Sequence, residues 1–459
     1  MKELTLKQLA QWCDGSVAPE YEELCATGIE SDSRVVKPGD LFVALPGERV
    51  DGHAFIPAAM AAGAAAALVT KAADGVPCIV VEDTLKAYGA IAAGYRRMMG
   101  VKVVGITGSV GKTTTKEMIA SVLQKDFRTA KTEGNHNNNL GLPMTIMHMP
   151  DDTQLLVLEM GMNHFGEMEY LSKIARPDLA VITNIGTMHI EHLGSREGIL
   201  QAKLEIMRGE AKDGVGILNG DEPLLWNVRG DGGHKKYYYG IENHACDVIA
   251  SDIQEMEDGM RFHVSGFHHE FELFVPVLGR HTVYNALAAA TAALLLGVKP
   301  ETIQNELSGF QNTGMRQKIY EKNGMTIIED CYNAGPESTE AALGVLASIK
   351  TTGHRIAVLG DMLELGNRSS AEHYRIGRLV AQKADMLFTY GAHSVRTVTG
   401  AITGGMPPKN TEHFDTHEDL ARMLRMRAAE GDVILFKGSR GMKMERSLEL
   451  FLNDTAREE

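Results

Sequence analysis

One glycine-rich loop carries the clearest chemical signal in the sequence. It reads Gly105-Ile106-Thr107-Gly108-Ser109-Val110-Gly111-Lys112-Thr113, between an apolar run and a helical run at 117–123. Glycines spaced by two residues let successive backbone N–H groups turn towards an anion, and the following helix adds its positive N-terminal end. Lys112 supplies a full charge for terminal phosphates, and the Thr113 hydroxyl can hold Mg²⁺. The loop predicts ATP binding, although Ile106 occupies the position of the first glycine in the common phosphate-loop pattern.

Two further polar side chains follow apolar runs that we interpret as buried strands. Glu159 comes directly after the run 155–158, and His189 follows the run 179–185. A carboxylate at the end of a strand, in the same sheet as a phosphate loop, is placed to bind Mg²⁺. Taken alone, Glu159 could be a solvated strand end and His189 a structural loop residue. Taken together, they favour a shared site.

Lys203 occupies an unusual place in a helical pattern. In the predicted helix 197–207, one face carries Ile199, Leu200, Lys203, Ile206 and Met207. A lysine inside an apolar stripe either extends its ammonium to the edge or is buried for a task. The pattern leaves both interpretations open.

The segment 132–141 is crowded with glycine and asparagine, including Asn135, Asn137 and Asn138. Such a run is typical of an ordinary surface loop. Because this one lies within reach of the same predicted sheet edge, a substrate-binding loop is an equal alternative.

The candidate residues need a scaffold in which strands alternate with helices. Apolar runs predict strands at 101–106, 155–158, 179–185 and 216–218, and again at 325–328, 355–359, 386–390 and 433–436. Shorter strands are expected near 41–44 and 66–70. Alternation of this kind predicts α/β domains with parallel sheets, which bind ligands at the carboxyl ends of their strands.

The length of the chain and two changes in its sequence pattern predict three domains. A chain of 459 residues is too long for one core of ordinary size. Boundaries at Gly100 and after the apolar helix 283–296 divide it into 1–99, 100–313 and 314–459. We expect a small N-terminal α/β domain, a central parallel-sheet ATPase domain and a C-terminal Rossmann-like α/β domain.

Composition narrows the class of partner. The formal net charge is −14, so the surface as a whole repels nucleic acid. Apolar runs are too short to span a bilayer, and the first residues do not form a secretory signal. The five cysteines form no CxxC pair, which favours a reducing cytoplasm over a disulfide framework or zinc site.

Taken together, the motifs resemble those of the Mur ligases, three-domain ATP-dependent enzymes that form amide bonds in bacterial cell-wall synthesis. The resemblance rests on the phosphate loop, Glu159-Met160-Gly161, the segment 184–195 and Ala202-Lys203-Leu204-Glu205-Ile206. It covers nearly the whole chain. In the first segment it implies that the UDP part of the substrate contacts Ser31, Asp32, Ser33, Arg34, Asp51, Gly52 and His53, with Asn135, Asn137 and Asn138 from the middle segment.

The resemblance also implies the chemistry. A substrate carboxylate would take the γ-phosphate of ATP, and an amine would attack the resulting acyl phosphate. Implied catalytic residues are Lys112, Lys203, His189 and Arg316. One Mg²⁺ would be held by Thr113 and Glu159, and a second by His189 and a carbamylated Lys203. Implied ATP contacts are Gly108, Ser109, Val110, Gly111, Lys112, Thr113, Thr114, Asn285, Arg316, Asp330 and Asn333.

Within the family, the chain resembles the member that adds D-alanyl-D-alanine to UDP-MurNAc-tripeptide. The motifs are Gly134-Asn135-His136-Asn137-Asn138, Leu278-Gly279-Arg280-His281, the segment 329–336 and the segment 358–366. A cytoplasmic monomer is implied. The alternatives are the tripeptide-forming relative, whose Asn-Pro-Arg selector is absent, and a folylpolyglutamate-type ligase, which lacks UDP motifs. A regulatory phosphate-loop ATPase would leave the first segment unexplained.

Overall fold

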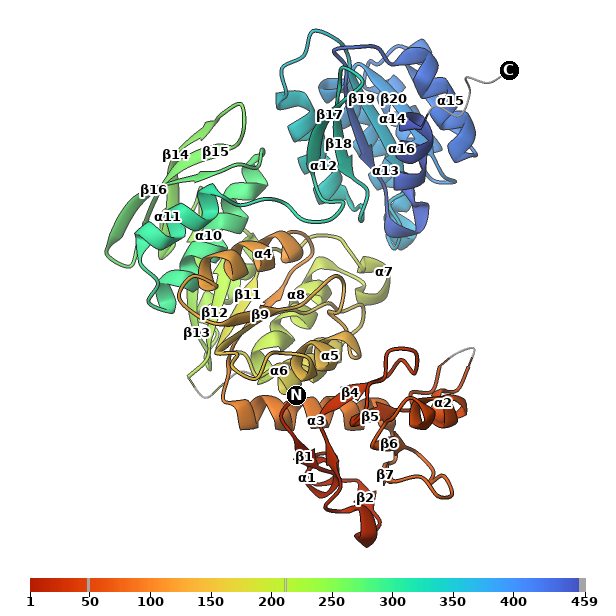
Figure 1. Cartoon of the computed structure of the whole chain (residues 1–459). Coiled ribbons are helices and arrows are strands. Elements are labelled where there is room, and N and C mark those ends of the chain that lie inside the picture. The colour runs from red at the N-terminus through yellow and green to blue at the C-terminus, as the bar shows by residue number, and fades with distance from the viewer. Residues whose placement is uncertain (48–49, 210, 212, 454–459) are drawn as a thin grey trace.

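The computed structural model describes residues 1–47, 50–209, 211 and 213–453, which form three bodies, each with its own main sheet (Figure 1). The N-terminal and C-terminal bodies lie on opposite sides of the middle one. Each main sheet lies within one of the predicted segments 1–99, 100–313 and 314–459. The predicted α/β class is therefore confirmed.

The first body is a small sheet covered by short helices and one long helix. Its five strands have the order β2-β7-β6-β5-β4, parallel except for β2. The elements are β1 (Leu4–Thr5), α1 (Leu6–Trp12), β2 (Ser16–Val17), β3 (Cys25–Ala26), β4 (Gly28–Glu30), β5 (Asp40–Val43), α2 (Ile56–Ala61), β6 (Ala66–Val69), β7 (Cys78–Val80) and α3 (Thr84–Met99).

The middle body holds nine strands in the order β16-β15-β14-β13-β12-β11-β8-β10-β9. The strand before the phosphate loop, β8, is flanked by β10 and β11, so the loop opens at the middle of the parallel part. The elements are β8 (Lys102–Thr107), α4 (Lys112–Leu123), β9 (Thr129–Lys131), α5 (Gly141–Met147), β10 (Leu155–Glu159), α6 (Glu167–Ala175), β11 (Leu179–Ile182), α7 (Ile190–Leu193), α8 (Arg196–Leu204), β12 (Val215–Asn219), α9 (Pro223–Asn227), β13 (Lys235–Gly240), β14 (Val248–Glu255), β15 (Met260–Gly266), β16 (His269–Val275), α10 (Arg280–Leu295) and α11 (Pro300–Ser308).

The end of this sheet differs from the parallel sheet expected. Strands β14, β15 and β16 pair antiparallel. The links between them are too short for a crossover helix, which a parallel pair requires. Phe267 and His268 both have positive φ (51° and 65°) in the two-residue turn between β15 and β16. Such turns usually carry Asn-Gly, so Phe267-His268 does not resemble a hairpin turn.

The third body repeats the alternation of strand and helix. Its sheet has the order β17-β18-β22-β19-β20-β21, parallel except for the edge strand β17. The elements are β17 (Lys318–Lys322), β18 (Met325–Asp330), α12 (Pro336–Ser348), β19 (Arg355–Gly360), α13 (Ser369–Lys383), β20 (Met386–Tyr390), α14 (Val395–Thr403), β21 (Thr411–Phe414), α15 (His417–Arg427), β22 (Val433–Lys437) and α16 (Met444–Leu452). Within the described part of the chain, no helix combines the length and apolarity needed to cross a bilayer.

Helix α3 joins the first two bodies through one continuous hydrophobic core. The Asp83 carboxylate accepts hydrogen bonds at its start, and Gly100 ends it with φ of 65°. Its apolar residues pack with α1 on one side and with α5 and α6 on the other. The Tyr95 hydroxyl donates to Asp151 at 3.1 Å, across the boundary. Apart from Leu278 of the middle body, the cores of the third body contain only its own residues, so the first two bodies form one mechanical unit.

We expect Ile91→Ala to destabilise the first and middle bodies together. Ile91 is fully buried in their shared core, and truncation of a buried isoleucine costs about 2–5 kcal/mol. Urea unfolding and hydrogen exchange measure the effect. Met98→Ala, on the exposed side of the same helix, is the control and should change stability by less than about 0.5 kcal/mol. Loss of protection confined to the first body would contradict a shared core.

Candidate active site

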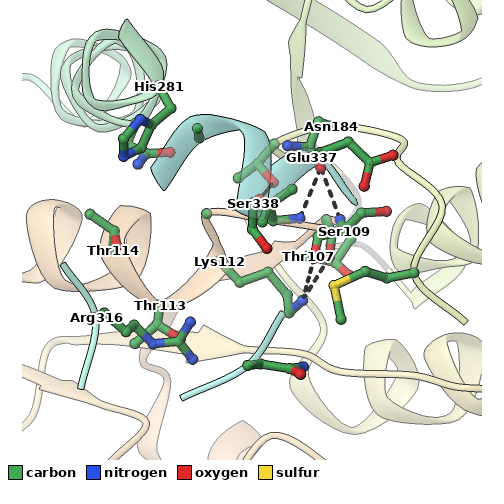
Figure 2. Close-up of a pocket in the computed structure, with 18 of the residues that line it drawn as sticks. Thr107, Ser109, Lys112, Thr113, Thr114, Asn184, His281, Arg316, Glu337 and Ser338 are labelled. Atoms are coloured by element: carbon green, nitrogen blue, oxygen red, sulfur yellow. Dashed lines mark hydrogen bonds between the residues drawn. The ribbon is translucent and has the colours of Figure 1, made fainter. Parts of the chain in front are cut away.

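A cavity of about 630 Å³ opens where the carboxyl ends of β8, β10 and β11 meet the third body. Residues of the phosphate loop line one side, and residues 330–342 with Lys437 line the other. Figure 2 shows this arrangement, with Lys112 bent back towards the loop and Glu337 and Ser338 approaching from α12. Binding at the ends of parallel strands is the arrangement expected for such sheets.

The phosphate loop is shaped by glycine and by the neighbouring strand. Gly108 and Gly111 have φ of 151° and 84°. A Cβ at Gly108 would lie 1.8 Å from Oγ1 of Thr183, so any side chain is excluded there. The Asn184 side-chain oxygen accepts hydrogen bonds from the backbone N–H groups of Ser109 and Val110, both at 3.0 Å. The loop is thus held in a turn before any phosphate binds.

Lys112 lies at the start of α4 and folds over this loop. Its Nζ donates to the carbonyl oxygen of Gly108 at 2.7 Å. Burial lowers the pKa of Lys112, Glu159 opposes that shift, and Arg316 adds to it. A half-buried ammonium held by neutral carbonyls is poised to bind an anion, because a phosphate supplies the charge that the carbonyls lack.

Glu159, at the end of β10, and Thr113, at the start of α4, are the two residues predicted to share one Mg²⁺, and their side chains are in contact. The Thr113 hydroxyl donates to Oε2 of Glu159 at 2.7 Å, and the Asn137 amide donates to Oε1 at 2.8 Å. These oxygen donors fit Mg²⁺. No group of three or more His, Cys, Asp or Glu residues suited to a metal ion occurs in the described ranges. An ion here would take few protein ligands and complete its shell with phosphate oxygens and water, as Mg²⁺ usually does.

Lys203 is buried, and only 2% of it is exposed. Helix α8 ends at Leu204 and continues as a 3₁₀ turn. The buried residues of this helix and turn include Ile199, Ile206 and Met207, besides Lys203. The side chain nevertheless lines the cavity. Burial, and then the charge of Lys112, lower the pKa of Lys203 well below its ordinary value. The ammonium does not extend to solvent, so a lysine buried for a task is the interpretation that the structure favours.

His189 lines the same cavity from the loop after β11. It precedes α7 and has φ of 63°, which is uncommon for a residue with a side chain. Its Nδ1 lies 2.6 Å from Oε2 of Glu364, a residue of the third body. The structure therefore brings His189, Lys203 and Glu159 to one cavity from three different segments.

The third body contributes the predicted residues Arg316, Asp330 and Asn333 to the cavity lining. The Arg316 guanidinium lies 4.0 Å from the ring centroid of Tyr332, a cation–π contact that orients it. The Asp330 carboxylate accepts from Lys437 Nζ at 2.6 Å. Asp330 and Lys437 sit opposite each other on neighbouring parallel strands, so both end at the same edge.

From the middle body, Thr114 and Asn285 line the cavity as predicted. The Asn285 side-chain oxygen accepts from the Thr115 hydroxyl at 3.2 Å, and a Cβ at Gly111 would lie 2.7 Å from it. Asn285 therefore packs against the phosphate loop.

The residues predicted to hold the UDP part fall into two groups. Asn137 and Asn138 line the cavity, while Asn135 does not. The other group lies in the first body, outside the cavity lining: Ser31, Asp32, Ser33, Arg34, Asp51, Gly52 and His53.

Internal contacts already engage several of this second group. The Arg34 guanidinium pairs with Asp32 at 2.6 Å, and its side chain is 86% exposed. His53 lies 2.7 Å from Asp51 and accepts from the Thr70 backbone N–H at 3.0 Å. These contacts shape a loop surface on the first body, and their role towards a UDP-sugar stays a prediction.

Several lining residues were missed when single residues were assigned roles. They are Asn184, Asn312, Glu337 and Lys437. Glu364, which contacts His189 from outside the lining, was missed as well. Lys437 ends an apolar strand just as Glu159 does, so the strand-end rule could have found it. Asn184 and Glu364 contact residues that are distant in the sequence, and no local sequence pattern predicts these contacts.

Comparison with known proteins places this geometry in a family. Models of the family match three consecutive stretches: "Mur ligase family, catalytic domain" at 26–106, "Mur ligase middle domain" at 106–293 and "Mur ligase, glutamate ligase domain" at 315–440. The chain belongs to the Mur ligase family.

Individual relatives match over almost the full length. The UDP-N-acetylmuramoyl-tripeptide–D-alanyl-D-alanine ligase of Bacillus subtilis (strain 168) is 42% identical over 448 residues, 96% of each chain. A crystal structure of MurF from Acinetobacter baumannii superposes with a TM-score of 0.91 at 33% identity, covering 98% of this chain and 99% of that one. MurF from Thermotoga maritima in complex with ADP gives 0.83 at 30% identity, covering 92% and 96%.

We expect Asn184→Ala to weaken ATP binding roughly five- to a hundredfold. The change leaves the N–H groups of Ser109 and Val110 without their side-chain acceptor, at a cost of about 1–3 kcal/mol. Calorimetric titration with ATP measures it. Asn305→Ala, on exposed α11 outside the cavity, is the control. Unchanged ATP affinity in the Asn184 variant would refute a role in shaping the loop.

Proposed function

We propose that this chain joins D-alanyl-D-alanine to UDP-MurNAc-tripeptide, with ATP converted to ADP and phosphate. The observation that carries the proposal is the cavity itself, in which a phosphate loop, the half-buried Lys112, the buried Lys203 and a strand-end carboxylate face the third body. The nearly full-length similarity to such ligases, at 30–42% identity for the chains compared above, supports the choice of substrates.

The reaction divides between the two sides of the cavity. The tripeptide carboxylate attacks the γ-phosphate of ATP, and the resulting acyl phosphate is attacked by the amine of D-alanyl-D-alanine, releasing phosphate. Lys112 and the loop N–H groups neutralise charge that develops on the transferred phosphoryl group. Arg316, held over Tyr332, reaches the same group from the third body. Closure of that body excludes water, which would otherwise hydrolyse the acyl phosphate.

Magnesium supports this transfer by neutralising phosphate charge when it is bound. Thr113 and Glu159 would hold one ion. His189 and a carbamylated Lys203 would hold a second. Carbamylation requires a neutral amine, and the lowered pKa of Lys203 keeps the amine neutral at a lower pH than that of an ordinary lysine. The carbamate would also convert a buried cation into an anionic ligand.

The proposal extends to how the UDP part of the substrate is bound, to the oligomeric state and to the cellular location. The loop surface at residues 31–34 and 51–53 would hold the UDP part, with Asn135, Asn137 and Asn138 along the path to the cavity. The family also suggests a monomer in the cytoplasm. The rival, a regulatory ATPase, would hydrolyse ATP without either substrate.

We expect phosphate release from ATP only when UDP-MurNAc-tripeptide and D-alanyl-D-alanine are both present. Each is omitted in turn in a coupled phosphate assay, and mass spectrometry identifies the pentapeptide product. Lys112→Ala is the negative control, since it removes the charge that faces the terminal phosphates. Steady hydrolysis of ATP alone, at the full rate, would favour the regulatory ATPase.

We expect Lys203→Ala to lower kcat by about 100-fold or more, as loss of a group that stabilises charge in the transition state does. Small carboxylates added to the assay should restore part of the activity. In wild-type protein, a carbamate signal should appear by ¹³C NMR after incubation with ¹³C-bicarbonate. Lys203→Arg keeps the charge but cannot carry the carbamate, so the signal should be absent. Full activity of Lys203→Ala would exclude the carbamate.

A further inference from the structure

Glu364 is the one contact from the third body to a proposed metal ligand that the described residues provide. It lies between β19 and α13, in the loop 361–368, and its Oε2 is 2.6 Å from Nδ1 of His189. The Glu364 side chain is half-exposed, whereas that of His189 is only 17% exposed. The contact crosses from the third body to the middle body.

The backbone at both ends of this contact is unusual. His189 and Glu364 have φ of 63° and 62°, in the left-handed region. This region costs a residue with a side chain roughly 1 kcal/mol or more, and such residues gather at functional sites. Two of them facing each other across a domain boundary indicate that the surrounding structure holds this pair in place.

Neighbouring contacts dock the same part of the third body. The Thr187 hydroxyl donates to the Glu337 carboxylate at 3.0 Å. A Cβ at Gly366 would lie 3.4 Å from the side chain of Glu191, so the loop packs directly against α7. The position of Glu364 is therefore set by the docking of the whole third body, and not by a lone side chain.

The chemistry of metal-bound histidine gives this contact a meaning. A histidine that binds a metal through one ring nitrogen commonly donates its other N–H to a carboxylate, which fixes the ring and raises its basicity. Here the carboxylate faces Nδ1, which leaves Nε2 as the nitrogen free to bind an ion. Although the contact is short, Nδ1 has no well-aligned hydrogen-bond acceptor in the described structure. Contacts of this kind often align only in the substrate complex.

We infer that Glu364 is a positioning residue for the second Mg²⁺: it orients His189 from the third body, so that the metal ligand is complete only when that body is docked. The inference rests on the proposed function, because that function supplies the second ion. It also gives the third body a second task besides carrying Arg316, since its docking would tighten an ion on the opposite wall of the cavity.

The test is Mn²⁺ binding, followed by electron paramagnetic resonance, to the full chain with UDP-MurNAc-tripeptide and a non-hydrolysable ATP analogue. In wild-type protein we expect a tighter and a weaker Mn²⁺ site. Glu364→Gln should weaken the second site about 10- to 100-fold, the usual effect of losing such a carboxylate. The first site and the melting temperature should stay unchanged, and Glu364→Asp should recover part of the affinity.

The control is Glu301→Gln, which removes the same charge from an exposed position of α11 outside the cavity lining. It should leave both Mn²⁺ sites as in wild type. Equal second-site affinity in Glu364→Gln and wild type would overturn the inference and leave the ligase assignment standing. Tighter binding in the variant would overturn it as well, because Glu364 would then compete with the ion for His189. A single Mn²⁺ site in wild type would remove the second ion from the proposed function and the inference with it.

Discussion

The active-site cavity depends on the hydrogen bonds between two loops, the phosphate loop after β8 and the loop after the neighbouring strand β11. The loop after β11 returns to the phosphate loop, where Asn184 accepts from two N–H groups and the Thr183 hydroxyl donates to the Val110 carbonyl at 2.6 Å. The Gly186 N–H in turn donates to the Ser109 hydroxyl at 2.9 Å. Lys112 and Thr113 directly follow the phosphate loop in the chain, so these hydrogen bonds set the direction in which α4 and its first side chains leave the loop. His189 lies at the far end of the same loop, so one segment shapes the anion site and carries a proposed metal ligand.

Two lysines of the cavity, the half-buried Lys112 and the buried Lys203, impose the second constraint. Lys112 and Lys203 are close enough for the charge of one to lower the pKa of the other. Desolvated ammonium groups are unfavourable without anions, and like charges add to that penalty. Around these two lysines, a phosphate would supply the negative charge that they lack, and their mutual repulsion favours loss of the charge on Lys203. This local charge is independent of the net charge of −14 on the whole chain.

Local sequence patterns predicted most of what is local in the structure. The strand that precedes the phosphate loop, the carboxylate at Glu159 and the buried face of Lys203 follow from periodicity of side chains and from the ends of strands. What could not be predicted depends on distant pairs. Asn184 and Glu364 lie in segments that carry the family resemblance, but nothing local in the sequence indicates that they contact Ser109 and His189. The antiparallel strands β14 to β16 were missed because Phe267-His268 does not resemble a hairpin turn.

Helix α3 also determines how many joints the molecule has. With 16 residues it is a rod about 24 Å long, and its buried faces lock the first body to the middle one. Only the third body then has rotational freedom to lose when the site assembles. Freezing one joint costs less entropy than freezing two, so more of the substrates' binding free energy is left for closing the cavity. Helix α3, with its buried faces, thus lowers the entropic cost of closing the cavity around three chemically different substrates.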